Sequence, residues 1–471
     1  MTLYPKSIGC DNVNLRNRLF DLERFPMRLI HRVVPFGFVA CLVCSSVAAT
    51  EPEPVLTDAA LRQILQERIK AKKAVGLVVG RLQGTNRSVV AAGTMSLTSS
   101  RPVDGDTVFE IGSITKVFTG TLLADMANRG EVQPNDPATK YLPPTVKMPS
   151  RNGQVITLAH LASHRSGLPR ELGNRPPGEN KPSPAYGPEM VFEFLSGYEL
   201  PRDPGSAYEY SNLGMGLLGD SLARRAGASY EQLVLDRICK PLGMNDTRLK
   251  LSEEMQNRFP TGHEYDLKPA KGFERLSLAG AGGLRTTPND FVKFLAVVLN
   301  PGDDRVSKAV KASQAVRTNI GVAGVEVAWG WHFRTVSDET ITHSGLVSGF
   351  HSFMGVNRKR NRAVVIFSNC SHSSDNIGMR LLDPQGQPDE STLERYVGTY
   401  EVTPTFALTV SREKYDMYVR ANDEPNLEIF PVGRDQLYGP GLSLSFRTNA
   451  SGMVTEVILR QGGKDLRAVR K

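Results

Sequence analysis

The stretch Phe109-Glu-Ile-Gly-Ser-Ile-Thr-Lys-Val-Phe-Thr-Gly-Thr-Leu-Leu-Ala-Asp-Met126 decides most about the fold of this chain. A short apolar run reaches Gly112, and from there apolar residues recur at spacings of three and four. That period is typical of a buried helix, so we expect a helix to begin near Ser113. Residues three apart lie on one face of a helix, which puts the Lys116 amine beside the Ser113 hydroxyl.

A serine beside an amine is a candidate nucleophile, because a hydroxyl reacts slowly unless a neighbouring base accepts its proton. The start of a helix also offers unpaired N–H groups and a positive dipole end, where an oxyanion could form. The spacing alone is weak evidence, since Ser411 and Lys414 repeat it. That second copy lies in a stretch predicted to be a strand, where residues three apart face opposite sides. We therefore expect only the copy at Ser113 to do chemistry.

Composition and charge exclude several classes of protein. The chain has 471 residues, 40% hydrophobic and 23% charged, which is usual for a soluble globular protein with more than one folding unit. Its net charge is +8; without residues 1–49 it keeps 51 Lys and Arg against 46 Asp and Glu, or +5. So small an excess is no signature of nucleic-acid binding. No His/Cys cluster has metal-ligand spacing, so we expect no metal and no other cofactor.

The N-terminal residues have the pattern of a secretory signal peptide. A basic segment at residues 27–32 precedes a mostly apolar stretch at residues 33–47, and small residues follow. We therefore expect residues 1–49 to be a leader, with Met27 as an alternative start, and the protein to be exported to the periplasm or cell envelope. A membrane anchor is the alternative, although the apolar stretch is short for one.

Beyond the leader, the chain divides into two parts by its pattern. Residues 50–382 begin with an amphipathic helix and two strands, turn mostly helical from Ser113 to about Asn300, and return to strands at residues 325–369. Residues 383–390 have the composition of a linker. Residues 391–471 hold only short strand-like runs, which predicts a small all-β, barrel-like C-terminal domain.

Two features of the main part stay open. The Pro-rich stretch from Gly167 to Glu189 has the length of either a functional lid or a mobile insertion. Three of the five cysteines lie in the leader, which leaves Cys239 and Cys370. Two cysteines are too few for a disulfide framework, so they either pair or remain buried thiols.

Two short motifs follow the serine and lysine along the chain. Tyr210-Ser-Asn212 is the only Tyr-x-Asn and precedes a helical run. A neighbouring lysine favours the phenolate form of a tyrosine, which could then take the serine proton. His343-Ser344-Gly345 is the only His-x-Gly, and a glycine in a strand lets the backbone approach a ligand closely. Taken singly, the tyrosine or the histidine of such a motif more often has a structural role than a catalytic one.

In this order, Ser-x-x-Lys, Tyr-x-Asn and His-x-Gly resemble the penicillin-recognising serine hydrolases, meaning the class C β-lactamases and related D,D-peptidases and esterases. Stretches at residues 156–169, 241–247 and 282–290 look like the same family, and the similarity runs from about residue 55 to 380. The resemblance implies an α+β fold of the β-lactamase/transpeptidase type. In that fold an antiparallel sheet is flanked by helices, and the site lies between the sheet and a helical subdomain.

The resemblance also implies roles for the candidate residues. Ser113 would be the acylated nucleophile, Lys116 its proton-accepting partner and Tyr210 a general base. The implied oxyanion hole consists of the N–H groups of Ser113 and Leu346. The residues implied to contact the substrate are Asn212, His343, Ser344, Gly345 and Leu346.

The third motif departs from the family's β-lactamases, which usually carry Lys-Thr-Gly there. A histidine is only partly charged near neutral pH, so we expect weaker carboxylate binding unless Arg285 or another cation helps. His-x-Gly looks more like the peptidases and esterases, and flanking stretches are similar to the periplasmic D,D-carboxypeptidase/endopeptidase branch. We therefore favour an exported serine hydrolase that acts on D-amino-acid amide bonds, with β-lactams as slow substrates.

Three alternatives remain. The chain could be a class C-like β-lactamase proper, or a carboxylesterase with the same residues. It could also be an inactive binding or sensor module on a hydrolase scaffold. The expected partners are a peptidoglycan stem peptide, a β-lactam or an ester, with association to the envelope and no nucleic acid.

Overall fold

The computed structural model describes residues 56–173, 187–271, 278–322, 324–335, 338–384, 387–414, 416–433, 435–439, 442–461 and 464–471. The expected leader, residues 1–49, lies outside these ranges, as do residues 174–186 of the Pro-rich stretch. The end of that stretch differs from the prediction, because helix α4 (Pro188–Gly197) begins before Glu189. Proline suits the first position of a helix, where its missing N–H would have had no partner.

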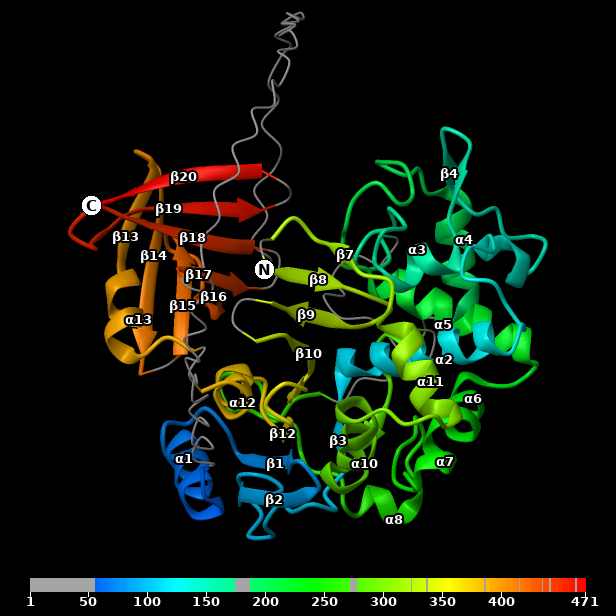
Figure 1. Ribbon diagram of the computed structural model, residues 1–471, viewed down its shortest axis with the longest axis horizontal. Helices are drawn as coiled ribbons and strands as arrows, with labels where there is room; N and C mark the ends of the chain where they lie inside the picture. The colour runs from blue at the N-terminus through cyan, green and yellow to red at the C-terminus, as the bar shows by residue number, and fades with distance from the viewer. Residues whose placement is uncertain are drawn as a thin grey trace, which may run out of the picture. The chain divides into compact units, whose positions relative to one another are not determined.

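Among the described residues, the centre of the fold is an antiparallel sheet of eight strands (Figure 1). They lie in the order β2-β1-β12-β11-β10-β9-β8-β7, so the first strand pairs with the last. The hairpin β1–β2 confirms the two strands predicted near the start of the chain. The strand bounds are β1 Gly76–Gln83, β2 Asn86–Gly93, β7 Thr318–Asn319, β8 Val325–Val327, β9 His332–Arg334, β10 Thr340–Val347, β11 Phe350–Asn357 and β12 Arg362–Ser368.

Both faces of the sheet are apolar, so both must be covered. In β12, Val364 and Ile366 belong to one buried cluster, and Val365 and Phe367 belong to another, because successive strand residues face opposite sides. Figure 1 shows helices on the two sides. One face carries α1 (Asp58–Lys70) and α12 (Asp375–Leu382); the other carries α2 (Thr115–Asn128), α10 (Pro288–Leu299) and α11 (Arg305–Ser313).

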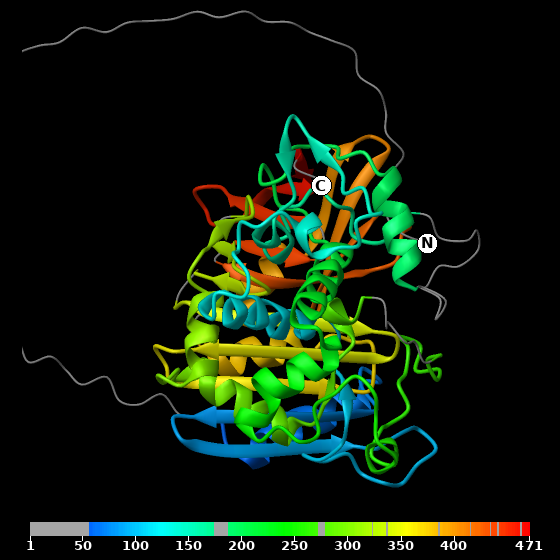
Figure 2. The same cartoon turned by 90° about the vertical axis from the view of Figure 1, so that its right-hand side faces the viewer.

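Helix α2 is buried on every side, as its apolar sequence predicts. All residues from Thr115 to Met126 are buried. A 3₁₀ turn at Gly112–Ile114 leads into the helix, which confirms a helix start near Ser113. The helical side of the molecule faces the viewer in Figure 2. Its other helices are α3 Leu158–Ala162, α5 Asn212–Ala226, α6 Tyr230–Val234, α7 Lys240–Leu242, α8 Glu253–Gln256 and α9 Ala279–Gly282.

A closed antiparallel barrel follows the short helix α13 (Glu390–Tyr396). The rings of Tyr396 and Phe446 stack in its core with centroids 4.4 Å apart, and Tyr400 packs edge-on against Phe446. The predicted barrel is confirmed, and Ser411 lies in one of its strands, as expected for the second Ser-x-x-Lys. Its strands are β13 Gly398–Thr403, β14 Phe406–Glu413, β15 Asp416–Ala421, β16 Leu427–Gly433, β17 Gln436–Gly439, β18 Leu442–Thr448, β19 Val454–Gln461 and β20 Lys464–Arg470.

Together these elements confirm the predicted α+β fold, with an antiparallel sheet, flanking helices, a helical subdomain and a C-terminal barrel. The boundaries at residues 382 and 390 stay predictions. Cys239 and Cys370 are both free, buried thiols. In the part of the chain that the structure describes, no helix is long and apolar enough to cross a membrane. No cluster of three metal-ligating side chains occurs there either.

Buried ion pairs join the barrel to the rest of the molecule. Asp416, at the start of β15, accepts hydrogen bonds from Arg68 Nη1 at 2.9 Å and from Lys73 Nζ at 2.7 Å. Arg68 also donates to the carbonyl of Ser373, and Asn376 of α12 donates to Asp416. Removing one partner from such a buried pair would leave an uncompensated charge, so these residues are expected to tolerate substitution poorly.

Glu428 of β16 should make the stability of the protein depend on pH. Burial, together with the negative charges of Asp416 and Asp375, raises the pKa of Glu428 from 4.5 to about 7, and Arg68 opposes that shift. The folded protein thus holds the proton more tightly than the unfolded chain. We expect the contribution of Glu428 to stability to be fully present below about pH 4.5 and to be lost, by on the order of 1–3 kcal/mol, as the pH rises through 7.

Thermal unfolding followed between pH 4.5 and pH 8 tests this expectation. Glu428→Gln removes the titrating group and should flatten the pH dependence of the unfolding midpoint over this range. Glu424→Gln is the matched control, because Glu424 is exposed on the same barrel. Equal slopes for the wild type and Glu428→Gln would contradict the assignment.

Candidate active site

Ser113 lies in the tight turn between β3 (Phe109–Glu110) and α2. Gly112 has φ +48°, a conformation that glycine adopts without strain. A Cβ on Gly112 would lie 3.0 Å from the backbone nitrogen of Leu346. The missing side chain therefore lets β10 pack directly against the turn that carries Ser113.

Lys116 is fully buried one helical turn after the serine. Its Nζ lies 2.9 Å from Ser113 Oγ, 2.7 Å from Asn212 Oδ1 and 2.6 Å from the carbonyl oxygen of Ala281 in α9. An ammonium group has three N–H donors, so these three oxygens match its capacity. The predicted contact of Lys116 with the serine is present, together with two further oxygens that orient the amine.

Tyr210 completes the contacts of the serine. Its Oη lies 2.8 Å from Ser113 Oγ. The ring stacks on His164 with centroids 4.5 Å apart, and Lys116 Nζ and the Arg170 guanidinium each lie 4.9 Å from the ring centroid. Two cations against one aromatic ring form cation–π contacts, which fix the position of the phenol oxygen.

The start of α5 explains why Tyr210 and Asn212 both face the lysine. Ser211 between them caps the helix, since its Oγ accepts from the Gly214 N–H at 2.8 Å. Its own N–H donates to His164 Nδ1 at 3.1 Å. Burial and the nearby Lys116 lower the pKa of His164 well below its usual value, so its ring is neutral and its Nδ1 can accept that bond.

Glu171 is a site residue that sequence reasoning missed. Asn212 Nδ2 donates to Glu171 Oε1 at 2.6 Å, while Asn212 Oδ1 accepts from Lys116. Each end of the Asn212 amide therefore has a defined partner. The only signal was the place of Glu171 at the end of the stretch Ser-Gly-Leu-Pro-Arg-Glu.

The register of β10 decides where the Leu346 N–H points. A two-residue turn joins β10 to β11, with Val347 opposite Phe350. In such a hairpin the closing pair is hydrogen-bonded, and so is every second pair after it. Leu346 falls between these pairs, so its N–H points away from β11, toward the open edge beside Ser113. Strand β9 pairs only with the first part of β10 and leaves this edge free.

His343 is uncharged at neutral pH, which corrects the expectation of a partly charged histidine. Burial, with the nearby His332 and Lys116, lowers the pKa of His343 well below its usual value. Its Nδ1 lies 2.8 Å from the Ser344 carbonyl oxygen, so Nδ1 carries the proton. Its Nε2 is buried with no hydrogen-bond partner among the described residues. The third motif thus offers a hydrogen-bond acceptor in place of a cation.

Arg285 does not supply the missing charge, because it is engaged elsewhere. Its Nη2 lies 2.8 Å from Glu110 Oε1. Arg334 at the end of β9 is a second residue that the sequence analysis missed. Its Nη1 is buried without a hydrogen-bond partner in the described part of the chain. Its charge helps to lower the pKa of His332, whose ring centroid lies 4.8 Å from that of His343.

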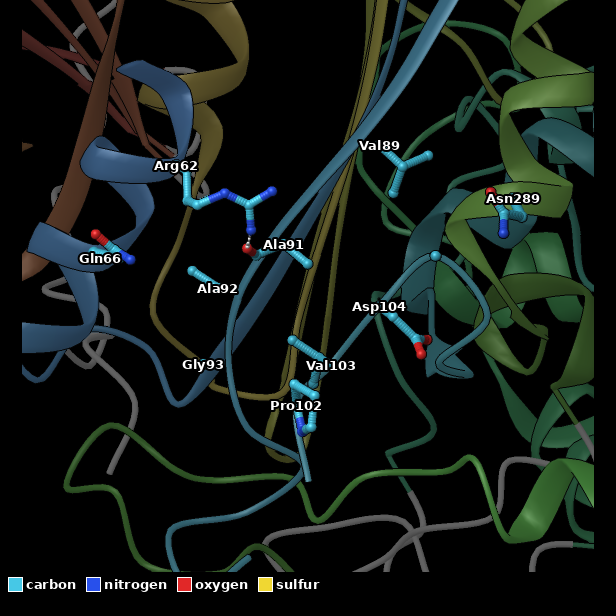
Figure 3. A pocket seen from close by; sticks show the side chains of 11 residues that line it. Arg62, Gln66, Val89, Ala91, Ala92, Gly93, Pro102, Val103, Asp104 and Asn289 are labelled. Carbon is cyan, nitrogen blue, oxygen red and sulfur yellow. Dashed lines mark hydrogen bonds between the residues drawn. The ribbon is translucent and has the colours of Figure 1, made fainter. Parts of the chain in front are cut away.

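A pocket lies away from these residues, between α1, β2 and the start of α10 (Figure 3). Arg62 donates across it to the Ala91 carbonyl oxygen at 2.8 Å, and Asp104 and Asn289 line its other side. None of the candidate site residues lines this pocket. The candidate active site therefore rests on the contacts of Ser113.

Family models match nearly the whole described chain. The model described as Beta-lactamase matches residues 61–385. The model described as "Domain of unknown function (DUF3471)" matches residues 382–470, which include the barrel.

Two curated proteins give the scale of the similarity. The D-alanyl-D-alanine-carboxypeptidase/endopeptidase AmpH of Escherichia coli (strain K12) is 32% identical over 275 residues, which cover 57% of this chain and 70% of that protein. Penicillin-binding protein 4* of Bacillus subtilis (strain 168) is 26% identical over 421 residues, which cover 80% of this chain and 91% of that protein.

Solved structures share the fold. A beta-lactamase/D-alanine carboxypeptidase from Yersinia pestis has a TM-score of 0.60 at 26% identity and covers 69% of this chain and 98% of its own. An octameric penicillin-binding protein homologue from Pyrococcus abyssi has a TM-score of 0.64 at 20% identity and covers 88% of this chain and 99% of its own. Because its identity is only 20%, the second structure supports the fold and nothing beyond it.

Proposed function

The chain belongs to the Beta-lactamase family of serine hydrolases, and from this premise we propose that it cleaves D-amino-acid amide bonds and β-lactams through an acyl-enzyme on Ser113. The names of two similar proteins, a D-alanyl-D-alanine-carboxypeptidase/endopeptidase and a penicillin-binding protein, support this substrate class. The proposal includes export to the periplasm or envelope, where peptidoglycan-type peptides are found. This part of the proposal is based on the signal-peptide pattern at the N-terminus.

One observation carries the proposal. Ser113 Oγ lies within hydrogen-bond distance of two groups, Lys116 Nζ at 2.9 Å and Tyr210 Oη at 2.8 Å. Either group accepts the serine proton once it has lost its own, Lys116 as the neutral amine or Tyr210 as the phenolate. A nucleophile needs such a base in contact with it, and here two converge on one hydroxyl. The N–H of Leu346 points toward the same turn, where it and the Ser113 N–H would hold a developing oxyanion.

The reaction follows from these positions. Ser113 Oγ forms a bond to the substrate carbonyl carbon, and its proton passes to the Lys116–Tyr210 pair. The carbonyl oxygen takes up the negative charge between the N–H groups of Ser113 and Leu346. When the C–N bond breaks, Tyr210 returns the proton to the leaving nitrogen. Water then attacks the carbonyl carbon of the ester and gives a proton to Tyr210. As the bond from that carbon to Ser113 Oγ breaks, Tyr210 passes the proton to Oγ and the acid is released.

Intact-protein mass spectrometry of residues 50–471 with benzylpenicillin tests the proposal. We expect a penicilloyl adduct that maps to Ser113 and is absent in Ser113→Ala. A long-lived adduct would favour a peptidase, and a short-lived one with penicillin turnover would favour a β-lactamase proper. Turnover that persists in Ser113→Ala would overturn the assignment of the nucleophile.

A carboxylesterase is the second candidate, and the state of His343 favours it. The neutral imidazole provides no fixed positive charge at the third motif for a substrate carboxylate. Neutral acyl esters need no such charge. Rapid hydrolysis of p-nitrophenyl esters, with no penicilloyl adduct, would select this candidate. A binding or sensor module should keep its function in Ser113→Ala, which separates it from both enzymes.

A further inference from the structure

The hydroxyl of Ser344 in the third motif is committed to a carboxylate. Ser344 lies between His343 and Gly345 on β10, and its Oγ donates to Asp375 Oδ2 at 2.5 Å. Asp375 is the first residue of α12 and only 4% exposed. A hydroxyl has a single proton, so this bond leaves Ser344 Oγ with lone pairs alone to offer a ligand.

Neighbouring groups hold Asp375 in this position. Its N–H donates to Ser373 Oγ at 3.1 Å. His351 Nε2 lies 3.4 Å from Asp375 Oδ1, and His351 Nδ1 accepts from the Ser374 N–H at 3.3 Å. Burial lowers the pKa of His351 to about 4, so the ring is neutral and its one proton sits on Nε2, facing the carboxylate.

The barrel holds the same segment from its other side. The N–H of Ser373 lies 3.3 Å from Glu428 Oε2 and donates to it, and Asn376 donates to Asp416. Residues on both sides of Asp375 therefore bind strands of the barrel. The docked barrel restrains the segment that carries Asp375.

The charge of Asp375 also acts on Arg334. Arg334 has a buried Nη1 with no hydrogen-bond partner in the described residues. Burial lowers the pKa of Arg334, and the negative charge of Asp375 partly offsets that effect. A carboxylate that stabilises a guanidinium in this way also weakens its attraction for a second carboxylate.

We propose that Asp375 is a specificity-determining residue of the Ser113 site, which selects against acyl donors that bring a carboxylate to the third motif. It acts by keeping the Ser344 proton and by offsetting the charge of Arg334. The inference rests on the proposed function, because it concerns which acyl donors reach Ser113. Anionic donors, including the β-lactams of the proposed function, are therefore expected to acylate Ser113 more slowly than they would without Asp375.

The test compares acylation by benzylpenicillin, which is anionic, with acylation by p-nitrophenyl acetate, which is neutral. Asp375→Asn keeps the shape of the side chain, removes its charge and can donate to Ser344 Oγ, which frees the serine proton. We expect the penicillin-to-ester ratio of acylation rates to rise by about tenfold, the value of one charge-assisted hydrogen bond. Asp423→Asn, at an exposed position of the barrel, should leave the ratio unchanged.

Further variants separate the outcomes. Asp375→Ala should shift the ratio in the same direction. It replaces Asp375→Asn in the test if the asparagine variant does not fold. In a Ser344→Ala background the gain from Asp375→Asn should shrink by about threefold, because coupled residues are not additive. An unchanged ratio in folded Asp375→Asn would overturn the inference and leave the proposed function standing. A wild type that neither donor acylates would overturn the proposed function first, and this inference with it.

Discussion

Lys116→Met is expected to slow acylation of Ser113 by about a thousandfold, within the range that a positioned acid–base group contributes. Lys116 is fully buried, and its amine lies 2.9 Å from Ser113 Oγ. Methionine fills similar space but cannot accept a proton or orient the Asn212 amide. The measurement is the rate of acyl-enzyme formation with a neutral ester, followed by intact mass.

The second Ser-x-x-Lys supplies the control for this variant. Lys414→Met changes the same residue type at the same spacing from a serine, but Lys414 is exposed and bound to Glu67 at 3.4 Å. The Lys414→Met variant should acylate Ser113 at the rate of the wild type. The folded state of Lys116→Met is checked by its unfolding midpoint, because the carbonyl of Ala281 loses a partner at a cost of about 1–3 kcal/mol. Acylation within tenfold of the wild type would mean that Tyr210 alone suffices as the base.

The features that could be predicted from the sequence depend on patterns among residues that are close together along the chain. The apolar period after Gly112 gave the buried helix α2, because a helix that is apolar all round must lie inside. Turn-separated strand runs gave the barrel. The order of three motifs predicted that Lys116 and Tyr210 lie beside Ser113, and both are within hydrogen-bond distance of its hydroxyl. The catalytic and substrate-binding roles of the motif residues stay predictions.

The features that could not be predicted depend on contacts between distant parts of the chain. Glu171 reaches Asn212, and Asp375 reaches Ser344, through packing that no spacing in the sequence encodes. The neutral state of His343 arises from burial and from the neighbouring His332 and Lys116, and neither is visible in a lone His-x-Gly. The role of Asp416 in docking the barrel required knowing which face of α1 meets β15.

Gly345→Ala is expected to lower acylation of Ser113 by about a hundredfold to a thousandfold, the range for losing one oxyanion-hole donor. The argument is steric, because a Cβ on Gly345 would overlap the Ile111 carbonyl oxygen and press on Ser352 Oγ. Ser352 Oγ itself donates to that carbonyl at 2.8 Å, so neither atom is free to move. Strand β10 must then withdraw from the turn, and Leu346 withdraws with it.

A glycine with open space around it provides the control for Gly345→Ala. Gly197 is the last residue of α4, and a Cβ added there would have no other atom within 4 Å, so Gly197→Ala should leave both acylation and stability unchanged. Overpacking at Gly345 should also lower the free energy of unfolding by about 1–3 kcal/mol. A variant with reduced stability but full acylation would separate packing from oxyanion binding. It would show that the Leu346 N–H is not the donor on which the reaction depends.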